Sequence, residues 1–531
     1  MGYSRYGTKL GYSVEARTKS YVDGNAPLGQ RRDLRYPNGL LWRVSEIHWP
    51  ADRPALSIPA PSPTAAGDFT WSKIVIAMAT QLEASGINGL QEVTTRPNGM
   101  SDKPSSQVLI VGAAVVGCLT AIQLAQAGID SEIIEMLPKS SDDPRSCGYF
   151  GAAQLFLDEL GIYKLMRSQG FMTRGLCWRT APIDDGKGGK RTGDIIASQP
   201  LCALDDTVFP VGSGLLNLTQ GQLNRICIQE ALKTGRVRIH FNTQLESVDE
   251  NTADGVVVTA RDVNSGETKQ YRGKYLVGAD GARSATRKAL GLAFPGYTWP
   301  ERLLATNVMV MNEEEILYHT HYVMSDVHWA VITPLQDPVV GQSTLWRYTV
   351  ALDPNDPRPD DEIISDANIL NHYESIMAGR RPLQVEIRAR SIYNIHQRLA
   401  PTLRKGNCLL AGDAAHVNNP IGAMGLNTGM LDSDALGKAL IMILKEGRSD
   451  SVLDIYNDER RKVFQFFVNP TSAENKMRVH HHPPETAVRD DWYFRMMADP
   501  SKLTEDQLKE SMKPYMETWR TDIRKLAKSM A

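Results

Sequence analysis

The sequence predicts an α/β protein in which a doubly wound, mostly parallel sheet is interrupted by an antiparallel sheet and followed by helices. Three observations predict this class. An apolar run at residues 108–111 leads through a glycine-rich turn into an alanine-rich segment. Strand and helix patterns then alternate as far as about residue 175, as they do in doubly wound sheets. Residues 296–390 have the pattern of successive strands, and the chain after residue 429 has a mainly helical pattern.

The first motif is a glycine-rich turn between a strand and a helix. Residues 108–111 suit a buried parallel strand, Gly112 begins the turn, and residues 115–127 form the expected helix. Free N–H groups and the helix dipole would favour a pyrophosphate at that helix N-terminus, as in Rossmann-like dinucleotide-binding domains. Gly112, Ala114 and Gly117 occupy the three fingerprint positions, and the Cβ of Ala114 narrows the approach to the phosphates.

A carboxylate follows the second predicted strand. Residues 129–134 form this strand, and Glu135 ends it 23 positions after Gly112. This is close to the spacing at which an acidic residue accepts the ribose hydroxyls of a dinucleotide. A carboxylate there disfavours a 2′-phosphate, so the motif argues against NADP at this position.

Two further strand–turn motifs follow downstream. The first, Gly278-Ala279-Asp280-Gly281-Ala282-Arg283-Ser284, follows a predicted strand at residues 275–277. The second, Gly412-Asp413-Ala414-Ala415-His416, follows a predicted strand at residues 407–411. It continues as a glycine-rich turn that leads into a helix, Pro420-Ile421-Gly422-Ala423-Met424-Gly425-Leu426-Asn427-Thr428-Gly429.

The order and spacing of the three motifs resemble those of class A flavoprotein monooxygenases related to 4-hydroxybenzoate hydroxylase, over roughly residues 105–470. Within that family the chain resembles the phenol hydroxylase-like branch, without its C-terminal thioredoxin-like domain. The resemblance implies FAD as cofactor, NAD(P)H and O2 as co-substrates and a small aromatic substrate. It also implies hydroxylation of a phenolic or other aromatic molecule through a flavin C4a-hydroperoxide, with secondary metabolism as one setting.

The resemblance also assigns residues to the flavin. Asp413 would accept a hydrogen bond from the ribityl chain, and Asp280 and Arg283 would lie where flavin and nicotinamide nucleotide meet. The helix after the last glycine-rich turn would face the flavin pyrimidine, where its dipole would stabilise negative charge. In the family a second glycine usually stands at position 423. The residues expected to bind the cofactor are Gly112, Ala114, Gly117, Glu135, Arg145, Gln220, Arg225, Asp280, Arg283, Gly412, Asp413, Pro420, Gly425, Leu426 and Asn427.

Catalytic residues are expected on chemical grounds, because no tight motif marks them. The strands that would roof the active site contain Tyr393 and His396, which could deprotonate a phenol, and Arg347, which could bind a substrate carboxylate. His328 and Tyr348 are further candidates of the same kind. We expect Tyr393, His396 and Arg347 to be the catalytic set, and we expect no metal site.

Alternative functions stay open. The same oxidant could serve epoxidation, Baeyer–Villiger insertion or decarboxylative hydroxylation, and the mass of the product distinguishes these reactions. Because Ala114 and Ala423 replace glycines, the chain could instead be a catalytically silent flavin-binding protein. A pure interaction protein would bind no flavin at all.

The pattern divides the chain into seven expected segments. They are a poorly ordered extension at 1–104, FAD-binding parts at 105–175, 216–295 and 391–440, a contribution to the substrate domain at 176–215, the substrate-binding sheet at 296–390, and C-terminal helices at 441–531.

Charge and composition limit the partners. A net charge of −2 over 531 residues argues against nucleic acid. No run of 18 apolar residues predicts an integral membrane span. The six cysteines have no C-x-x-C spacing, which fits reduced thiols in a cytoplasmic protein rather than disulfides or a zinc site. A homodimer is expected only because homodimers are common in the family that the chain resembles.

Overall fold

The structure is a computed structural model, and it describes residues 106–141, 145–201, 211–313 and 315–529. The described residues all lie within one compact unit of the chain, Ser101–Ala531. The expectation of a poorly ordered extension at residues 1–104 lies outside the described residues.

The first motif lies in a six-stranded sheet with the strand order β10-β2-β1-β14-β22-β21. Its neighbouring strands are parallel except for the antiparallel pair β21–β22. The central strands are fully buried, which is why their sequences are continuously apolar rather than alternating. The strands are β1 (Val108–Val111), β2 (Ser131–Ile134), β10 (Val237–His240), β14 (Tyr275–Gly278), β21 (Arg404–Lys405) and β22 (Cys408–Leu410).

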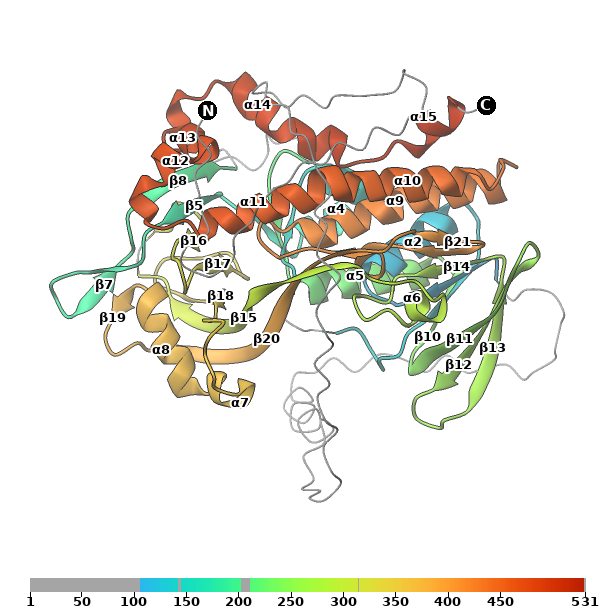
Figure 1. Cartoon of the computed structure of the whole chain (residues 1–531), viewed down its shortest axis with the longest axis horizontal. Helices are drawn as coiled ribbons and strands as arrows, with labels where there is room; N and C mark the ends of the chain where they lie inside the picture. Colours follow the sequence, from blue (N-terminus) through green and yellow to red (C-terminus); the bar gives the residue numbers. More distant parts are fainter. Residues whose placement is uncertain (1–105, 142–144, 202–210, 314, 530–531) are drawn as a thin grey trace, which may run out of the picture. The chain divides into compact units, whose positions relative to one another are not determined.

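Helices and a small antiparallel sheet pack on this parallel sheet (Figure 1). Helix α2 (Val115–Gln126) packs against both α5 (Gln220–Lys233) and α9 (Met424–Leu444). A three-stranded meander contacts β1, β2 and β14, and it consists of β11 (Thr243–Thr252), β12 (Gly255–Asp262) and β13 (Thr268–Gly273). The predicted doubly wound sheet is therefore confirmed.

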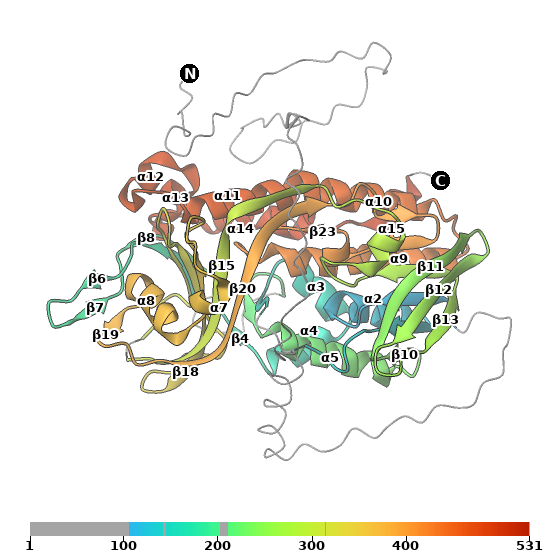
Figure 2. The ribbon, with the colours of Figure 1, turned by 60° about the horizontal axis from the view of Figure 1, so that its bottom comes forward.

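A second sheet has eight strands in the order β23-β20-β15-β18-β17-β16-β5-β8. Its pairs are antiparallel except for the parallel pair β16–β5. Figure 2 shows the long strands β15 and β20 running side by side. The strands are β5 (Gly175–Arg179), β8 (Ile195–Pro200), β15 (Gly296–Met311), β16 (Thr320–Val323), β17 (Ala330–Pro334), β18 (Ser343–Ala351), β20 (Glu386–Leu399) and β23 (His416–Val417).

This second sheet extends beyond residues 296–390. Strands β5 and β8, which lie between residues 175 and 200, also belong to it. The expected boundary at residue 390 lies inside β20, whose far end pairs with β23 of the third motif. The sheet that should bind the substrate is thus continuous with a motif that should bind the flavin.

The two faces of the second sheet pack against different parts of the chain. On one face, Leu304, Trp346 and Tyr348 form a core with helix α8 (Asp366–Ile376). On the other face, Leu303, Trp178 and Ile395 pack with residues of the third motif and of the C-terminal helices. This second face therefore looks toward the proposed flavin region.

Helices dominate the C-terminal part, as predicted. Two π-helical segments, Phe464–Val468 and Pro514–Thr518, lie among them. No helix of the described residues is long and apolar enough to cross a membrane. The C-terminal helices are α10 (Val452–Val463), α11 (Asn469–Val479), α12 (Ala487–Asp490), α13 (Trp492–Met497), α14 (Glu505–Lys513) and α15 (Ile523–Lys528). The shorter elements that precede them are α3 (Ala152–Glu159), α4 (Ile162–Arg167), α6 (Ala285–Ala289), α7 (Asp360–Ile363), β3 (Gly148–Tyr149), β4 (Phe171–Met172), β6 (Ile183–Asp184), β7 (Gly189–Arg191), β9 (Leu216–Asn217) and β19 (Gly379–Arg380).

Candidate active site

The first motif forms a turn in which two positions require glycine. Gly112 has a φ of +106°, and a Cβ there would lie 2.5 Å from the carbonyl oxygen of Ala279. A Cβ at Gly117 would lie 2.0 Å from the carbonyl oxygen of Gly112. Ala114, by contrast, has a φ of −77° and is exposed, so its methyl group strains no backbone. The turn therefore keeps the tight geometry of a dinucleotide site despite the alanine.

Glu135 lies beside this turn. Its Oε2 accepts a hydrogen bond of 2.8 Å from the N–H of Ala113, and its Oε1 accepts one of 2.8 Å from the N–H of Leu137. Helix α2 begins without a side-chain cap and has no acidic residue in its first turn. The carboxylate and the uncapped helix end fit a ribose and a pyrophosphate respectively.

The second motif is held by its own aspartate. Asp280 accepts hydrogen bonds from the Ser284 hydroxyl at 2.6 Å and from the Thr286 N–H at 2.9 Å, which fixes the start of α6. The exposed Arg283 lies on the same turn. Arg287 is buried and donates to the carbonyl oxygen of Ala414 at 2.9 Å, so it ties the second motif to the third.

The third motif is supported by a buried charge network. Asp432 on α9 accepts hydrogen bonds from the Gly412 N–H at 2.9 Å and from His416 Nε2 at 2.7 Å. Its other oxygen accepts one from Arg460 Nε at 2.7 Å. Burial opposes ionisation of Asp432, but His416 and Arg460 outweigh it and lower the pKa of the carboxyl. This network places His416 in a positional role.

Asp413, in the same turn, differs from Asp432 in its surroundings. The residue is exposed to solvent, yet the protein around it desolvates the carboxyl and raises its pKa, against the nearby charges of His416 and Arg145. Because it is accessible, this carboxylate suits a hydrogen bond from a ligand hydroxyl, such as one on the ribityl chain of FAD.

The glycine-rich turn ends in the left-handed region. Ala423, at the N-cap of α9, has a φ of 53° and gives the helix no side-chain cap. Asn427 donates to the carbonyl oxygen of Gly148 at 2.9 Å, and its Oδ1 is buried without a partner among the described residues. Pro420 is exposed, and Gly425 and Leu426 are half-buried. The uncapped helix end and the unpartnered amide oxygen fit a polar ring edge, as the flavin would present.

Weaker candidates lie around the same region. The side chain of Gln220 accepts a hydrogen bond of 3.2 Å from the N–H of Ser146 and so holds the segment that contains Arg145. The backbone carbonyl of Arg145 also accepts a hydrogen bond from Arg347. Arg225 is exposed on α5. The structure thus places Gln220, the first residue of α5, against the loop that contains Arg145, and it leaves Arg225 on the helix surface.

Two of the three expected catalytic residues share one sheet face. Arg347 pairs with Asn307 and Tyr393 pairs with Leu303, and these partners are four residues apart on β15. Because side chains alternate along a strand, both point to the face that packs toward the third motif. Burial raises the pKa of Tyr393 to about 12, although the charge of Arg347 lowers it in part. Arg347 is buried, and no carboxylate of the described residues forms an ion pair with it.

The other candidates lie elsewhere. His396 is three residues from Tyr393 on the same strand, so it points to the opposite face, where its Nδ1 lies 2.9 Å from the Thr298 hydroxyl. Tyr348 is buried in the core beneath α8. His328 Nδ1 lies 3.0 Å from the Ala351 carbonyl oxygen. The structure therefore does not bring these three side chains to the face of Tyr393 and Arg347.

Two aromatic residues that sequence reasoning missed do lie on that face. Trp178 on β5 pairs with Tyr322 on β16, and their rings stack at 5.3 Å between centroids. Tyr322 is also hydrogen-bonded to the backbone of Gly422 in the glycine-rich turn. No local pattern marks this pair, because the two strands are distant in sequence and meet only in the folded sheet.

Several known proteins are similar to this chain in sequence or in fold. Residues 105–471 match a family described as an FAD binding domain. Para-nitrophenol 4-monooxygenase of Pseudomonas sp. (strain WBC-3) is 33% identical over 73% of this chain and 91% of its own length. The 6-hydroxy-3-succinoylpyridine 3-monooxygenase HspB of Pseudomonas putida (strain DSM 28022 / S16) is 31% identical over 73% of this chain and 92% of its own. The crystal structure of p-nitrophenol 4-monooxygenase PnpA from Pseudomonas putida DLL-E4 superposes with a TM-score of 0.67 at 30% identity, covering 78% of this chain and 98% of that one.

The chain belongs to the class A FAD-dependent aromatic hydroxylases. The family and enzyme class predicted from the three motifs, FAD-dependent monooxygenase, are thereby confirmed.

Proposed function

We propose that this monooxygenase hydroxylates a small aromatic molecule that carries an acidic group, such as a phenol or a phenolic acid, with NAD(P)H and O2 as co-substrates. The observation that supports this substrate class is the buried Arg347, which has no carboxylate partner among the described residues. Burying a charge without a counter-ion is costly, so an anionic substrate group would complete the site. The relatives named for nitrophenol and hydroxypyridine substrates agree with this proposal.

In this proposal, each side chain on the sheet face of Tyr393 and Arg347 has a separate role. FAD, when bound, supplies the redox chemistry that activates O2. Trp178 and Tyr322 would pack against the substrate ring, and Arg347 would hold its anionic group. With its pKa raised to about 12, Tyr393 is protonated at neutral pH and can donate a hydrogen bond to a substrate oxygen. The apolar core around these residues would keep water from the reacting atoms.

The test of the reaction is NAD(P)H oxidation by the FAD-loaded protein with a panel of phenols and phenolic acids, together with product masses. Stimulated oxidation and a product one oxygen atom heavier would support hydroxylation. Oxygen gain with loss of carbon dioxide would favour the decarboxylating alternative. Bound flavin without any stimulated oxidation would favour a catalytically silent protein.

Replacing Arg347 with glutamine tests the substrate class. We expect kcat/KM for a phenolic acid to fall by roughly 100-fold, because a hydrogen-bonded charge in a buried site is lost. For a neutral analogue of the substrate, kcat/KM should fall far less. The matched control is Arg390→Gln, since Arg390 pairs with Thr306 and lies on the opposite face of the sheet, bonded to Asp366. Equal losses on acidic and neutral substrates would contradict the proposed anchor.

The opposite face of β20 offers a place for the nicotinamide nucleotide. Arg398 donates to the Thr298 hydroxyl at 3.3 Å, which His396 also contacts, and to the carbonyl oxygen of Phe294 at 3.2 Å. Burial and the charge of Arg398 lower the pKa of His396. No carboxylate of the described residues forms an ion pair with His396, Arg398 or Arg283. We propose that the positive charge of Arg398 on this face attracts the pyrophosphate of NAD(P)H.

Arg398→Gln is expected to raise KM for NAD(P)H about tenfold, with kcat and the Kd for FAD unchanged, because a charge-assisted contact to an anion is removed. Added salt should raise KM for NAD(P)H in the wild type more than in the variant. Steady-state kinetics at several ionic strengths measures both effects. A KM that stays at the wild-type value would assign the nucleotide to another surface.

We also propose a cellular compartment and an oligomeric state for the protein. Five cysteines in the described residues are free, which fits work in the reducing cytoplasm. A homodimer is the proposed assembly, and sedimentation velocity would test it.

A further inference from the structure

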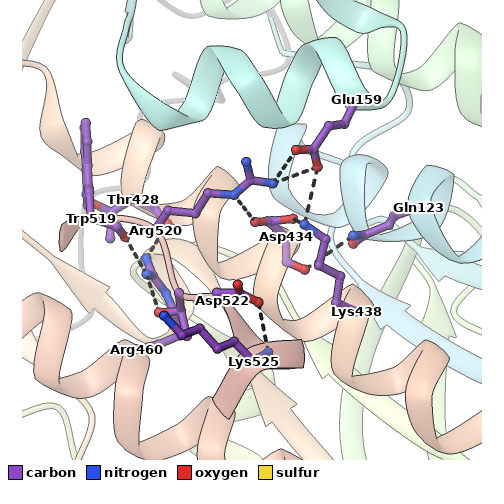
Figure 3. A network of polar contacts seen from close by, with 11 residues as sticks. Gln123, Glu159, Thr428, Asp434, Lys438, Arg460, Trp519, Arg520, Asp522 and Lys525 are labelled. Carbon is purple, nitrogen blue, oxygen red and sulfur yellow. Dashed lines mark hydrogen bonds and ion pairs between the residues drawn. The ribbon is translucent and has the colours of Figure 1, made fainter. Parts of the chain in front are cut away.

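A segment beyond the matched family region reaches the same motifs. The match ends at residue 471, whereas Trp519 follows the π-helical segment Pro514–Thr518 near the C-terminus. Trp519 is fully buried, as are Thr428, Asp432 and Arg460, its direct or indirect partners. Figure 3 shows Trp519 beside Thr428 and Arg460, with Arg520 bonded to both Glu159 and Asp434.

One chain of hydrogen bonds leads from the indole of Trp519 to the glycine-rich turn. The Trp519 Nε1–H donates to the Thr428 hydroxyl at 2.9 Å. That hydroxyl donates in turn to the carbonyl oxygen of Met424 at 2.8 Å. Met424 is the first residue of α9, directly after the left-handed Ala423. The indole thus fixes the first turn of the helix that would face the flavin.

A second chain leads from the backbone of Trp519 to the turn of the third motif. Arg460 donates to the Trp519 carbonyl oxygen at 2.7 Å and to Asp432 at 2.7 Å. Asp432 accepts from the N–H of Gly412, the residue before Asp413. The Trp519 ring also contacts Phe150, with 5.2 Å between ring centroids. Phe150 lies five residues after Arg145 in the sequence.

We propose that Trp519 is a positioning residue of the flavin site. It joins the two backbone segments that would contact FAD, the Gly412–Asp413 turn and the first turn of α9, through buried hydrogen bonds of its indole N–H and of its backbone carbonyl oxygen. Removing its N–H leaves the Thr428 hydroxyl without a donor and loosens the first turn of α9. This inference rests on the proposed flavin site, and it assigns the C-terminal segment a role in holding the cofactor.

The test uses the full-length protein, stripped of flavin and titrated with FAD. Flavin fluorescence gives the Kd, visible circular dichroism reports the surroundings of the bound flavin, and thermal unfolding of the flavin-free protein reports stability. We expect Trp519→Phe, which keeps the ring packing, to raise the Kd about tenfold and to change the flavin dichroism. Thr428→Val should act in the same way, whereas Thr428→Ser, which keeps the hydroxyl, should bind FAD like the wild type.

The matched control is Arg524→Ala. Arg524 anchors α15 through an exposed ion pair with Glu446 and lies in the same C-terminal segment, but it contacts neither chain of hydrogen bonds. Its Kd for FAD should equal that of the wild type. If Trp519→Phe does not fold, the comparison of Thr428→Val with Thr428→Ser decides alone.

A lower unfolding midpoint with an unchanged Kd and dichroism in Trp519→Phe and Thr428→Val would overturn the inference and leave the proposed function intact. Failure of the wild type itself to bind FAD would instead overturn the proposed flavin site, and this inference with it.

Discussion

Replacing Asp432 with alanine is expected to lower the free energy of unfolding by about 3–5 kcal/mol, because it leaves the fully buried Arg460 without its carboxylate. His416 and the N–H of Gly412 lose the same acceptor. Urea unfolding of the flavin-free protein, followed by circular dichroism, measures the change. The Gly412–His416 turn should also lose its geometry, so FAD binding should weaken together with stability.

The control for this variant is Asp450→Ala. Asp450 pairs with Arg404 at 2.7 Å but is largely exposed, so its loss should cost less than about 1 kcal/mol. A similarly small loss in Asp432→Ala would contradict the structural role of the buried network.

The stability that the Asp432–Arg460 pair contributes should depend on pH in a direction that follows from the pKa of Asp432. The pKa of Asp432 is lowered in the folded protein, since His416 and Arg460 outweigh burial. Its contribution to stability is therefore present above the unfolded pKa of about 3.9 and is lost as the pH falls toward the folded value. Asp432→Ala should lack this part of the acid sensitivity of the wild type.

The first motif shows what local sequence can predict. Gly112, Gly117 and Glu135 lie within one strand–turn–helix–strand unit, so their spacing already determines that they meet. Each glycine is required by a backbone contact within or next to the turn, which a fingerprint encodes directly. The doubly wound sheet followed from the same unit, repeated at the second and third motifs.

The sheet face proposed to bind the substrate shows where this reasoning stops. Tyr393 and His396 are close in sequence and both lie on β20. They point to opposite faces of the sheet, because they are three residues apart and side chains alternate along a strand. Both residues were expected on a strand, but they were chosen for their chemistry, and the alternation of side chains along that strand was not used to separate them. Trp178 and Tyr322 become neighbours only through the parallel pairing of β5 with β16, which no local pattern specifies.

The buried network shows a second limit. The region after residue 429 was expected to be helical, and α9 and α10 confirm that. A helical pattern states that Asp432 and Arg460 lie on helices, but it does not state which faces meet. Their pairing, and the docking of Trp519 on both helices, depend on how the C-terminal segment packs.

Replacing Gly117 with alanine is expected to raise the Kd for FAD by roughly 100-fold or more. The added Cβ would lie 2.0 Å from the carbonyl oxygen of Gly112, a backbone atom that cannot rotate away as a side chain can. Gly112 has little room to shift toward the second motif, because a Cβ built on it would already lie 2.5 Å from the carbonyl oxygen of Ala279. The turn must therefore open, and its N–H groups would no longer converge on the pyrophosphate.

The control separates this effect from the cost of replacing any glycine. Gly161, the N-cap of α4, has a φ of +76° and open space around it, so Gly161→Ala should cost about 1 kcal/mol of backbone strain. Its Kd for FAD should stay at the wild-type value, since α4 carries none of the three motifs. FAD titration of both variants, with unfolding curves for each, measures the two effects independently. If Gly117→Ala bound FAD as tightly as Gly161→Ala, the turn at Gly112 would not be the pyrophosphate site, and the cofactor would have to be placed on the remaining two motifs.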